Sequence, residues 1–398
     1  MYKTFEKSLM FIVKQYRRLF SNSQNEIWIF IPASDGSLGD QALLQPFQDK
    51  YASAFKIKLV RIKGMVPINL KEKCEEHFVI EFGSRKNRID YILSLRKCHR
   101  VFVLGADIFD GRYYLGQSVA YIKYTDIAAR LNIKCKFVGF SFSKNPKAEV
   151  VDAVKSSHKD IIYLLRDPAS HERFINDTGR NCAQLVADNA FNLLPELKAD
   201  SAIACKKWLD DLPEKSIVLG LNVNVLTFRG REAEIFKAIT ETVCGYLNEN
   251  QHRYVVYIPH DFREQQSDWE SHKKIMENLS EEHKLRCFSL EKDINAWDVK
   301  AITKYVDMVL TGRMHLAIAA LGQLTPALCI TYVNKFEGLL KHFKLDDFDM
   351  VLEPEIAYSD SSNTLVKINN ILSDLDKITA TIKVALPEVK ALATCNLD

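Results

Sequence analysis

Basic and imidazole side chains follow two apolar runs in the second half of the chain. Arg313 and His315 come directly after Val306–Leu310, and Lys335 follows the next run, Ala327–Tyr332. Both runs are typical of strands buried on both faces, and the strands of one β-α-β unit are usually neighbours. Two cations and an imidazole at helix N-termini predict an anion-binding site. The alternative is that the cations are solvated loop charges and that His315 caps a helix.

A comparable arginine follows an apolar run in the first half. Arg166 comes directly after Ile161–Leu165, and Pro168 stands where a helix would begin. If the sheet of the first half faces the sheet of the second, Arg166 points into the cleft between them. The alternative is an ion pair between Arg166 and Asp167 or Glu172.

A glycine-containing loop, SDGSLGD at residues 34–40, follows the first strand-like run. Its glycines let backbone N–H groups approach a ligand, and the helix that begins there supplies a positive dipole end. The spacing matches neither the dinucleotide fingerprint nor a P-loop. The candidate binding residues of this loop are Asp35, Gly36, Ser37 and Asp40. The alternative is a tight turn in which Asp40 is the helix N-cap.

Two further carboxylates, Asp107 and Asp110, lie in the segment GADIFDG after the strand-like run Arg100–Gly105. They occupy the same edge of the predicted sheet as Arg166, because ligands bind at the carboxyl ends of strands in open α/β sheets. They either contact a polyhydroxylated ligand or cap their own loop.

Strand-like and helical patterns alternate along the chain and must position these side chains. Helical patterns cover Asp40–Tyr51, Ser118–Leu131 and Glu232–Asn248, for example. The predicted strands are Ile27–Ala33, Ile57–Arg61, Arg100–Gly105, Cys135–Phe142, Ile161–Leu165, Ser216–Asn222, Tyr254–Pro259, Val306–Leu310 and Ala327–Tyr332. Repeated strand-helix-strand order predicts parallel sheets with helices on both faces.

The chain is long enough for two such domains. Its 398 residues are too many for one ordinary hydrophobic core, and the segment from Leu194 to Lys215 links one α/β series to the next. We expect two doubly wound, Rossmann-like domains that face one another across a cleft, as in GT-B glycosyltransferases. The predicted divisions are residues 1–200, residues 201–350 and a C-terminal helical segment, 351–398, that packs back across the domains.

Composition excludes several classes of protein. The net charge is +3, and Lys and Arg are spread along the chain, so nucleic acid is not an expected partner. None of the nine cysteines forms a CxxC pair, which predicts free thiols in a reducing, cytoplasmic compartment. No His, Cys or carboxylate cluster has metal-ligand spacing, so no metal site is predicted.

The N-terminal segment, residues 1–20, has the pattern of a basic amphipathic helix. Its apolar residues recur at helical spacing at Phe5, Leu9, Ile12, Tyr16 and Leu19. Lysines and arginines surround that stripe, as in helices that lie on an anionic membrane surface. The segment therefore predicts either peripheral contact with a membrane or a helix docked on its own domain.

The motifs together resemble the polysaccharide pyruvyl transferase family. The resemblance covers roughly residues 30–340 and rests on GSLGD, GADIFDG, LLRDPAS, DNAF and the segment from TGRMH to KFEG. Its most specific part is Arg-x-His-Leu, Gly-x-x-x-Pro and Lys between Arg313 and Lys335. Ser37 stands where the family usually has Asn, and the turn at 105–107 is reduced to Gly-Ala-Asp.

The resemblance implies a GT-B-like fold and a reaction. Family members transfer a pyruvate-derived group from phosphoenolpyruvate to two hydroxyls of one sugar and form a cyclic ketal. In the family, the residues that match Arg166, Arg313, His315 and Lys335 are associated with donor binding and catalysis. Both departures from the family pattern lie in the first domain, which is expected to face the acceptor.

These implications complete the hypothesis. Phosphoenolpyruvate carries a phosphate and a carboxylate, so its site needs several cations and no cofactor. Ketal formation requires an acid/base group near neutral pKa, which favours His315 as the catalytic residue. Arg166, Arg313 and Lys335 would bind the donor, while Asp35, Gly36, Ser37, Asp40 and Asp107 would bind the acceptor. That acceptor would be a sugar or a lipid-linked oligosaccharide.

Two other functions fit the same residues. A glycosyltransferase that uses a nucleotide sugar would hold its diphosphate with the same cationic loops. A noncatalytic protein that binds sugars or anions would retain its ligand without turnover.

Overall fold

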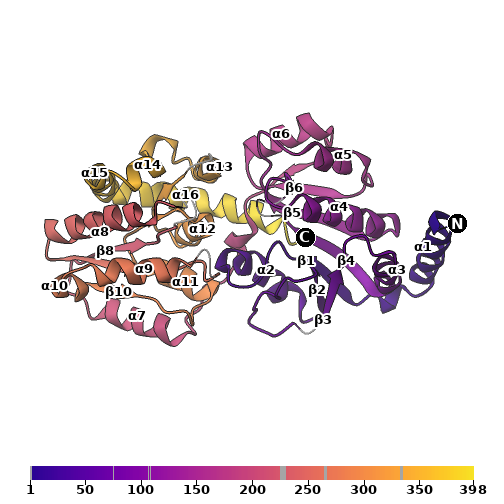
Figure 1. Cartoon of the computed structure of the whole chain (residues 1–398), viewed down its shortest axis with the longest axis horizontal. Coiled ribbons are helices and arrows are strands. Elements are labelled where there is room, and N and C mark those ends of the chain that lie inside the picture. Colours follow the sequence, from indigo (N-terminus) through magenta and orange to yellow (C-terminus); the bar gives the residue numbers. More distant parts are fainter. Residues whose placement is uncertain are drawn as a thin grey trace. The chain divides into compact units, whose positions relative to one another are not determined.

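The computed structural model describes residues 2–74, 76–105, 107, 109–224, 230–263, 267–331 and 335–398. The side chains of Tyr2, Lys3 and Lys335 lie outside this description. The chain divides into two compact units, each built on one sheet (Figure 1). Unit 1 comprises Met1–Asp35, Leu43–Asn189 and Leu392–Asp398, and unit 2 comprises Gly36–Ala42 and Ala190–Ala391.

Unit 1 contains a seven-stranded parallel sheet with the order β3-β2-β1-β4-β5-β6-β7. The strands are β1 (Glu26–Phe30), β2 (Lys56–Ile62), β3 (Glu76–Ile80), β4 (Cys98–Leu104), β5 (Lys134–Phe140), β6 (Ile162–Leu165) and β7 (Gln184–Leu185). The helices are α1 (Tyr2–Leu19), α2 (Leu38–Tyr51), α3 (Arg85–Ser94), α4 (Leu115–Arg130), α5 (Ala148–Ser156) and α6 (Pro168–Thr178). The order reverses direction at β1 and β4, which is the signature of a doubly wound sheet.

Side chains of β4 alternate between the two faces of this sheet. Val101 and Val103 belong to the core that also contains Tyr121 of α4. Phe102 points to the other face and contacts Phe47 and Tyr51 of α2, with ring centroids 4.8 and 5.6 Å apart. Both faces are therefore covered, which explains why the strands are apolar almost throughout.

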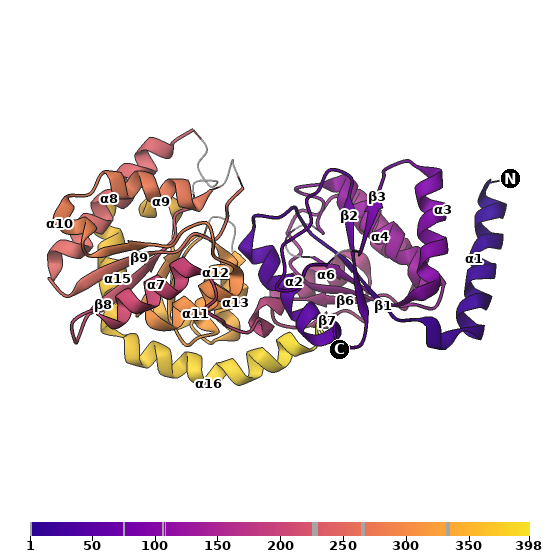
Figure 2. The same cartoon turned by 90° about the horizontal axis from the view of Figure 1, so that it is seen from below.

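Unit 2 contains a six-stranded parallel sheet with the order β10-β9-β8-β11-β12-β13. The strands are β8 (Ile217–Leu221), β9 (Arg253–Tyr257), β10 (Cys287–Ser289), β11 (Met308–Thr311), β12 (Ala327–Ile330) and β13 (Val351–Leu352). In Figure 2 the sheet lies between α8 (Glu232–Glu249) with α9 (Asp268–Glu277) and α7 (Asp200–Asp210) with α11 (Ala296–Ile302). The prediction of two doubly wound parallel sheets is confirmed.

The remaining helices of unit 2 follow the strands or close the chain. They are α10 (Glu281–Lys284), α12 (Met314–Leu321), α13 (Lys335–His342), α14 (Pro354–Ala357), α15 (Ser361–Ser373) and α16 (Leu375–Thr394). The last residues of α16 and the C-terminal tail, Leu392–Asp398, belong to unit 1, where the Tyr51 hydroxyl donates to the Leu397 carbonyl and Asn396 donates to the Ala187 carbonyl.

The nine predicted strands all exist, with ends that differ by up to three residues from the expected ones. Four strands were not predicted: β3, β7, β10 and β13. Residues of β3 are mostly half-buried, and the other three strands are two or three residues long. Such edge strands carry too little apolar pattern to stand out in a sequence.

Residues 36–42 are grouped with unit 2, although Asp35 and the rest of α2 belong to unit 1. The Leu38 N–H donates to the His260 carbonyl over 3.1 Å, and the Phe262 N–H donates to the Gly36 carbonyl over 2.8 Å. Ser37 and Asp261 form an isolated antiparallel bridge. The glycine loop is therefore hydrogen-bonded to the segment that follows β9.

Candidate active site

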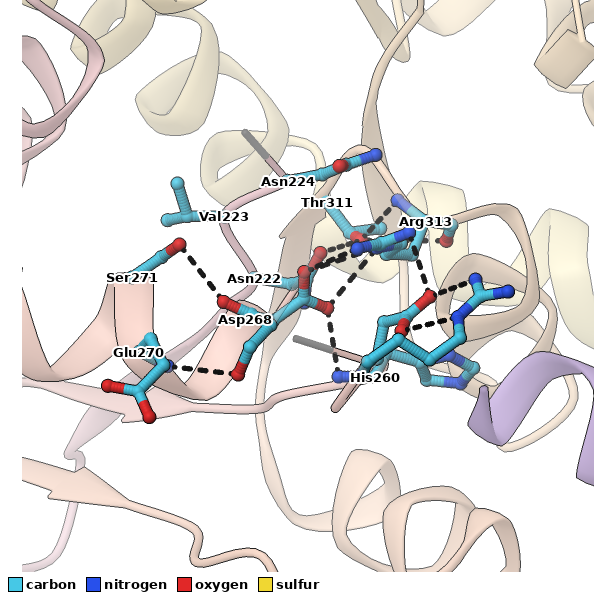
Figure 3. A network of polar contacts seen from close by, with 12 residues as sticks. Asn222, Val223, Asn224, His260, Asp268, Glu270, Ser271, Thr311 and Arg313 are labelled. Atoms are coloured by element: carbon cyan, nitrogen blue, oxygen red, sulfur yellow. Dashed lines mark hydrogen bonds and ion pairs between the residues drawn. The ribbon is translucent and has the colours of Figure 1, made fainter. Parts of the chain in front are cut away.

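Polar side chains gather at the carboxyl ends of β9, β8 and β11, which are adjacent strands of unit 2. Asn222 follows β8, the segment from His260 to Arg263 follows β9, and Arg313 follows β11. Asp268, the first residue of α9, joins them from the same edge (Figure 3). Parallel strands deliver their loops to one edge, so residues far apart in the sequence meet there.

Arg313 is held between two carboxylates. Its Nη2 donates to Asp268 Oδ1 over 2.7 Å, and its Nη1 donates to Asp261 Oδ2 over 3.3 Å. The Arg313 side chain is 13% exposed. Burial alone would lower the pKa of Arg313, but the Asp268 and Asp261 carboxylates outweigh burial and raise it. The guanidinium is therefore a fixed, permanent cation.

Asp268 organises the centre of this network. Its Oδ2 accepts from the His260 N–H over 3.0 Å and from Asn222 Nδ2 over 2.8 Å (Figure 3). Thr311 Oγ1 in turn donates to Asn222 Oδ1 over 3.1 Å. Burial raises the pKa of Asp268, and the Arg313 guanidinium opposes that rise. Because all these partners of Asp268 are N–H donors, we treat it as ionised.

A second guanidinium shares Asp261. Arg263 Nε donates to Asp261 Oδ1 over 2.9 Å, and Arg263 Nη2 donates to Asp261 Oδ2. The Arg263 side chain is 33% exposed, against 2% for Asp261. Two arginines and two aspartates thus balance in charge, and Arg263 is the more accessible of the two arginines. An incoming anion would meet guanidinium groups that are already oriented by Asp261.

His315 lies against the glycine loop. It is the second residue of α12, and a Cβ added to Gly39 would fall 2.4 Å from His315 Nδ1. Only a residue without a side chain allows the backbone of α2 to approach the imidazole so closely. Gly39 therefore fixes one side of the space that His315 occupies.

Three other titratable groups surround His315 and Arg313. Asp40 is buried, and burial raises its pKa while Arg263 and His315 oppose the rise. Burial also lowers the pKa of His260 well below its usual value, with smaller contributions from His315 and Arg313. His272 is lowered to a pKa of about 3, mainly by burial and also by Arg313, so it is neutral at physiological pH.

The loop residues predicted to bind a ligand are divided between the two units. Gly36, Ser37 and Asp40 lie with the unit 2 network, whereas Asp35 lies in unit 1 and accepts from the Asn69 N–H over 2.9 Å. Ser37 Oγ accepts from the Asp40 N–H over 3.3 Å. The N-cap is therefore Ser37, and the alternative that assigned this role to Asp40 is wrong, because α2 begins two residues earlier, at Leu38.

Arg166 forms a separate network at the carboxyl edge of the unit 1 sheet. Its guanidinium pairs with Asp107 and with Asp188, the latter over 2.9 Å, and its Nε donates to Ser141 Oγ over 2.7 Å. The side chain is only 1% exposed. Burial would lower the pKa of Arg166, but the two carboxylates raise it. Neither Asp167 nor Glu172 is among these ion-pair partners; Asp167 instead caps α6.

The remaining predicted residues differ in how far the structure describes them. Lys335 begins α13, but its side chain lies outside the described part of the chain. Asp110 accepts from the Arg112 N–H over 2.8 Å and so stabilises its own loop. Of the four residues assigned to donor binding and catalysis, the structure brings Arg313 and His315 together in unit 2 and places Arg166 in unit 1.

Sequence reasoning missed the two aspartates and the second arginine of the network. His260, Asp261 and Arg263 follow a predicted strand directly, so the rule that identified Arg313 would also have identified them. Asp268 is different. It lies at the start of α9, and no local pattern distinguishes it from an ordinary acidic residue in a first helical turn.

Two doubly wound α/β units with polar sites at strand ends define the class of GT-B-like proteins. Solved structures with this architecture include UDP-bound MnaA of Staphylococcus aureus, at 12% identity, 93% and 94% coverage of the two chains and a TM-score of 0.56. The UDP-GlcNAc 2-epimerase of Methanocaldococcus jannaschii is 11% identical, with 86% of this chain and 92% of the epimerase covered and a TM-score of 0.54. A UDP-forming trehalose-phosphate synthase of Burkholderia vietnamiensis is 10% identical, with 94% of this chain and 95% of the synthase covered and a TM-score of 0.53. At these identities the similarity defines the fold alone.

The sequence identifies the family within that class. The pattern that defines the polysaccharide pyruvyl transferases matches residues 68–334, so the chain belongs to this family. The match includes Arg166, the segment from His260 to Arg263, Arg313 and His315. No curated protein sequence matches the chain.

Proposed function

We propose that the protein transfers a pyruvate-derived group from phosphoenolpyruvate to two hydroxyls of one sugar of a polysaccharide or its precursor. The observation that carries this proposal is the juxtaposition of His315 with the Arg313–Asp261–Arg263 group at one sheet edge. The family match supports pyruvyl transfer, and the donor is our inference from the chemistry of the site.

The two arginines suit a donor with two anionic groups. Phosphate and carboxylate can each accept two hydrogen bonds from the planar fork of a guanidinium, and a guanidinium oriented by an aspartate loses little freedom when it binds them. We propose that Arg263 and Arg313 hold the donor in this way. Arg166 and Lys335 correspond to donor-binding positions of the family, and their contribution stays a prediction.

The reaction needs one proton relay. The methylene carbon of phosphoenolpyruvate takes a proton, a sugar hydroxyl adds to the adjacent carbon, phosphate leaves, and the second hydroxyl closes the ketal. The two hydroxyls lose two protons; one becomes part of the new methyl group and one leaves with phosphate. We assign the transfer at the methylene carbon to His315, because it lies beside both the glycine loop and Arg313, whereas burial depresses the pKa values of His260 and His272.

A metal is not part of this proposal. The carboxylates at the site, Asp261 and Asp268, are already bonded to guanidinium groups, and this leaves them poorly suited as metal ligands. Among the described residues no group of three His, Cys, Asp or Glu side chains could hold a metal ion.

The acceptor is the less defined substrate. We propose a sugar or a lipid-linked oligosaccharide, and we propose that Gly36, Ser37 and Asp40 contact it beside His315. Asp35 and Asp107 stay weaker candidates, since both are engaged within unit 1.

All nine cysteines are free thiols, which is consistent with a reducing compartment such as the cytoplasm.

The donor can be tested by phosphorus NMR of a mixture that contains the enzyme, a sugar acceptor, phosphoenolpyruvate and a UDP-sugar. We expect the phosphoenolpyruvate signal to be replaced by inorganic phosphate while the UDP-sugar stays intact. Consumption of the UDP-sugar with release of UDP would instead support the glycosyltransferase alternative. If the protein binds either compound but consumes neither with any of several sugar acceptors, it is a binding protein.

A further inference from the structure

Helix α1 exposes an apolar stripe. Its largest contributors are Phe5, Ile12 and Leu19, which are 54%, 62% and 75% exposed, and Tyr16 lies on the same side. At 100° per residue these positions fall within one narrow sector of the helix. Large apolar side chains in such a row on a surface usually mark a site of contact with another protein or with a membrane.

The helix is nevertheless fixed to unit 1 by its other side. Val13 is buried in the main core, and the Arg17 guanidinium donates to the backbone carbonyls of Leu95 and Cys98. Glu6 accepts from Arg88 of α3 over 2.7 and 2.9 Å. Figures 1 and 2 place α1 beside α3 at the edge of the unit. The stripe is thus presented by a docked helix.

The charged side chains of α1 are mostly positive. Lys7, Lys14 and Arg18 are exposed, and within the described part of the chain none of them has an ion-pair partner. Glu6, the single carboxylate of the helix, is used by Arg88. The cations share the helix face opposite the apolar stripe, at spacings of seven and four residues.

We propose that the apolar stripe of α1 docks on an anionic lipid bilayer. An interfacial helix places aromatic and aliphatic residues among the acyl chains and directs Lys and Arg toward the headgroups and the aqueous side. The exposed stripe of α1 and its three unpaired cations match that arrangement. No described helix is long and apolar enough to cross a bilayer, so the contact would lie at the surface.

Charge favours a lipid surface over a second copy of the chain as the occupant. A symmetric pair of α1 helices would leave the three cations of each copy uncompensated, whereas an anionic bilayer attracts them. This inference does not depend on the identity of the donor. If the acceptor is lipid-linked, the docked helix would hold the enzyme at the surface where that acceptor is found.

Flotation or sedimentation with vesicles tests the proposal. We expect the protein to bind vesicles of phosphatidylcholine in which about one third of the lipid is anionic phosphatidylglycerol. With vesicles of pure phosphatidylcholine, we expect the protein to stay unbound in solution. The triple variant Lys7→Gln, Lys14→Gln, Arg18→Gln should bind about a hundredfold more weakly at low salt. Ile12→Ser with Leu19→Ser should weaken binding at least about tenfold, with little dependence on salt.

Matched controls remove the same charge and apolar area elsewhere. Lys144→Gln, Lys155→Gln, Lys159→Gln removes three exposed cations of unit 1, and Leu285→Ser with Val384→Ser removes two exposed apolar residues of unit 2. Both controls should bind like the unmodified protein.

Two outcomes would overturn the proposal. One is absence of binding to anionic vesicles by the folded, unmodified protein at low salt. The other is a dimer in sedimentation equilibrium that becomes a monomer in Ile12→Ser with Leu19→Ser, which would show that a second copy covers the stripe.

Discussion

Gly39→Ala would place a methyl group against His315. The added Cβ would lie 2.4 Å from Nδ1 and 3.0 Å from Cγ of the imidazole, whereas ordinary contact begins at 3.4 Å. The ring and the first turn of α2 must therefore separate by about 1 Å, the difference between 3.4 and 2.4 Å. A misplacement of about 1 Å in a catalytic group can cost about a hundredfold in rate.

The expected defect is kinetic. Alanine is more favourable than glycine in a helix by about 0.5–1 kcal/mol, which offsets part of the cost of the crowded contact, about 1–3 kcal/mol. The variant should therefore fold, with a melting temperature within a few degrees of the parent. Steady-state assays of phosphate release should give a kcat about a hundredfold lower, with a smaller change in KM for the donor.

Gly116→Ala is the matched control. Gly116 is also the second residue of its helix, α4, and the nearest atom to an added Cβ is 4.0 Å away, in Phe82. This variant should keep normal kinetics. If folded Gly39→Ala had the kcat of the parent, the position of His315 in α12 would not matter for turnover, and its catalytic assignment would be wrong.

Four further predictions follow from the network. His315→Ala should lower kcat by about 10²–10⁴-fold and change donor affinity much less, as measured by steady-state kinetics and calorimetry; normal turnover would exclude the acid/base role. Arg313→Lys should weaken donor binding by about tenfold or more, because an ammonium cannot replace a two-pronged grip; unchanged calorimetric affinity would remove Arg313 from the donor site. The free energy of unfolding should fall as pH drops from the unfolded His value, about 6.5, toward the folded pKa of His272, about 3. Over that range His272 is protonated in the unfolded chain while the buried imidazole stays neutral, so His272→Gln, followed by denaturant titration, should flatten the slope by up to about 1.4 kcal/mol per pH unit; an equally steep slope would contradict the depressed pKa. Exhaustive chelation should leave turnover unchanged; loss of activity that one divalent ion restores would show a metal requirement.

The sheets were predictable from the sequence because strands covered on both faces are apolar in almost every position. Runs such as Val306–Leu310 and Ile161–Leu165 therefore stand out, and the edge strands β7 and β13, with two residues each, do not. The grouping of residues 36–42 with unit 2 was not predictable either. It depends on hydrogen bonds from Leu38 and Phe262 to backbone carbonyls, which a sequence pattern does not encode.

The site shows the same division. Arg313 and His315 follow a strand directly, and strand ends are where ligands bind in open α/β sheets, so both could be identified. Their partners could not all be identified, since Asp268 reaches Arg313 across 45 positions of sequence. Arg166 was recognisable as a strand-end arginine, but its burial and its pairing with Asp107 and Asp188 depend on the tertiary fold.

Mass spectrometry of the acceptor tests the central claim most directly. The enzyme would be incubated with ¹³C-labelled phosphoenolpyruvate and a panel of oligosaccharides and lipid-linked precursors, with His315→Ala in parallel. We predict a product heavier by labelled pyruvate less one water, released as labelled pyruvate by mild acid, and formed at the parent rate only by the unmodified enzyme. A labelled product that His315→Ala forms at the parent rate, or an unchanged acceptor across the whole panel, would contradict the account.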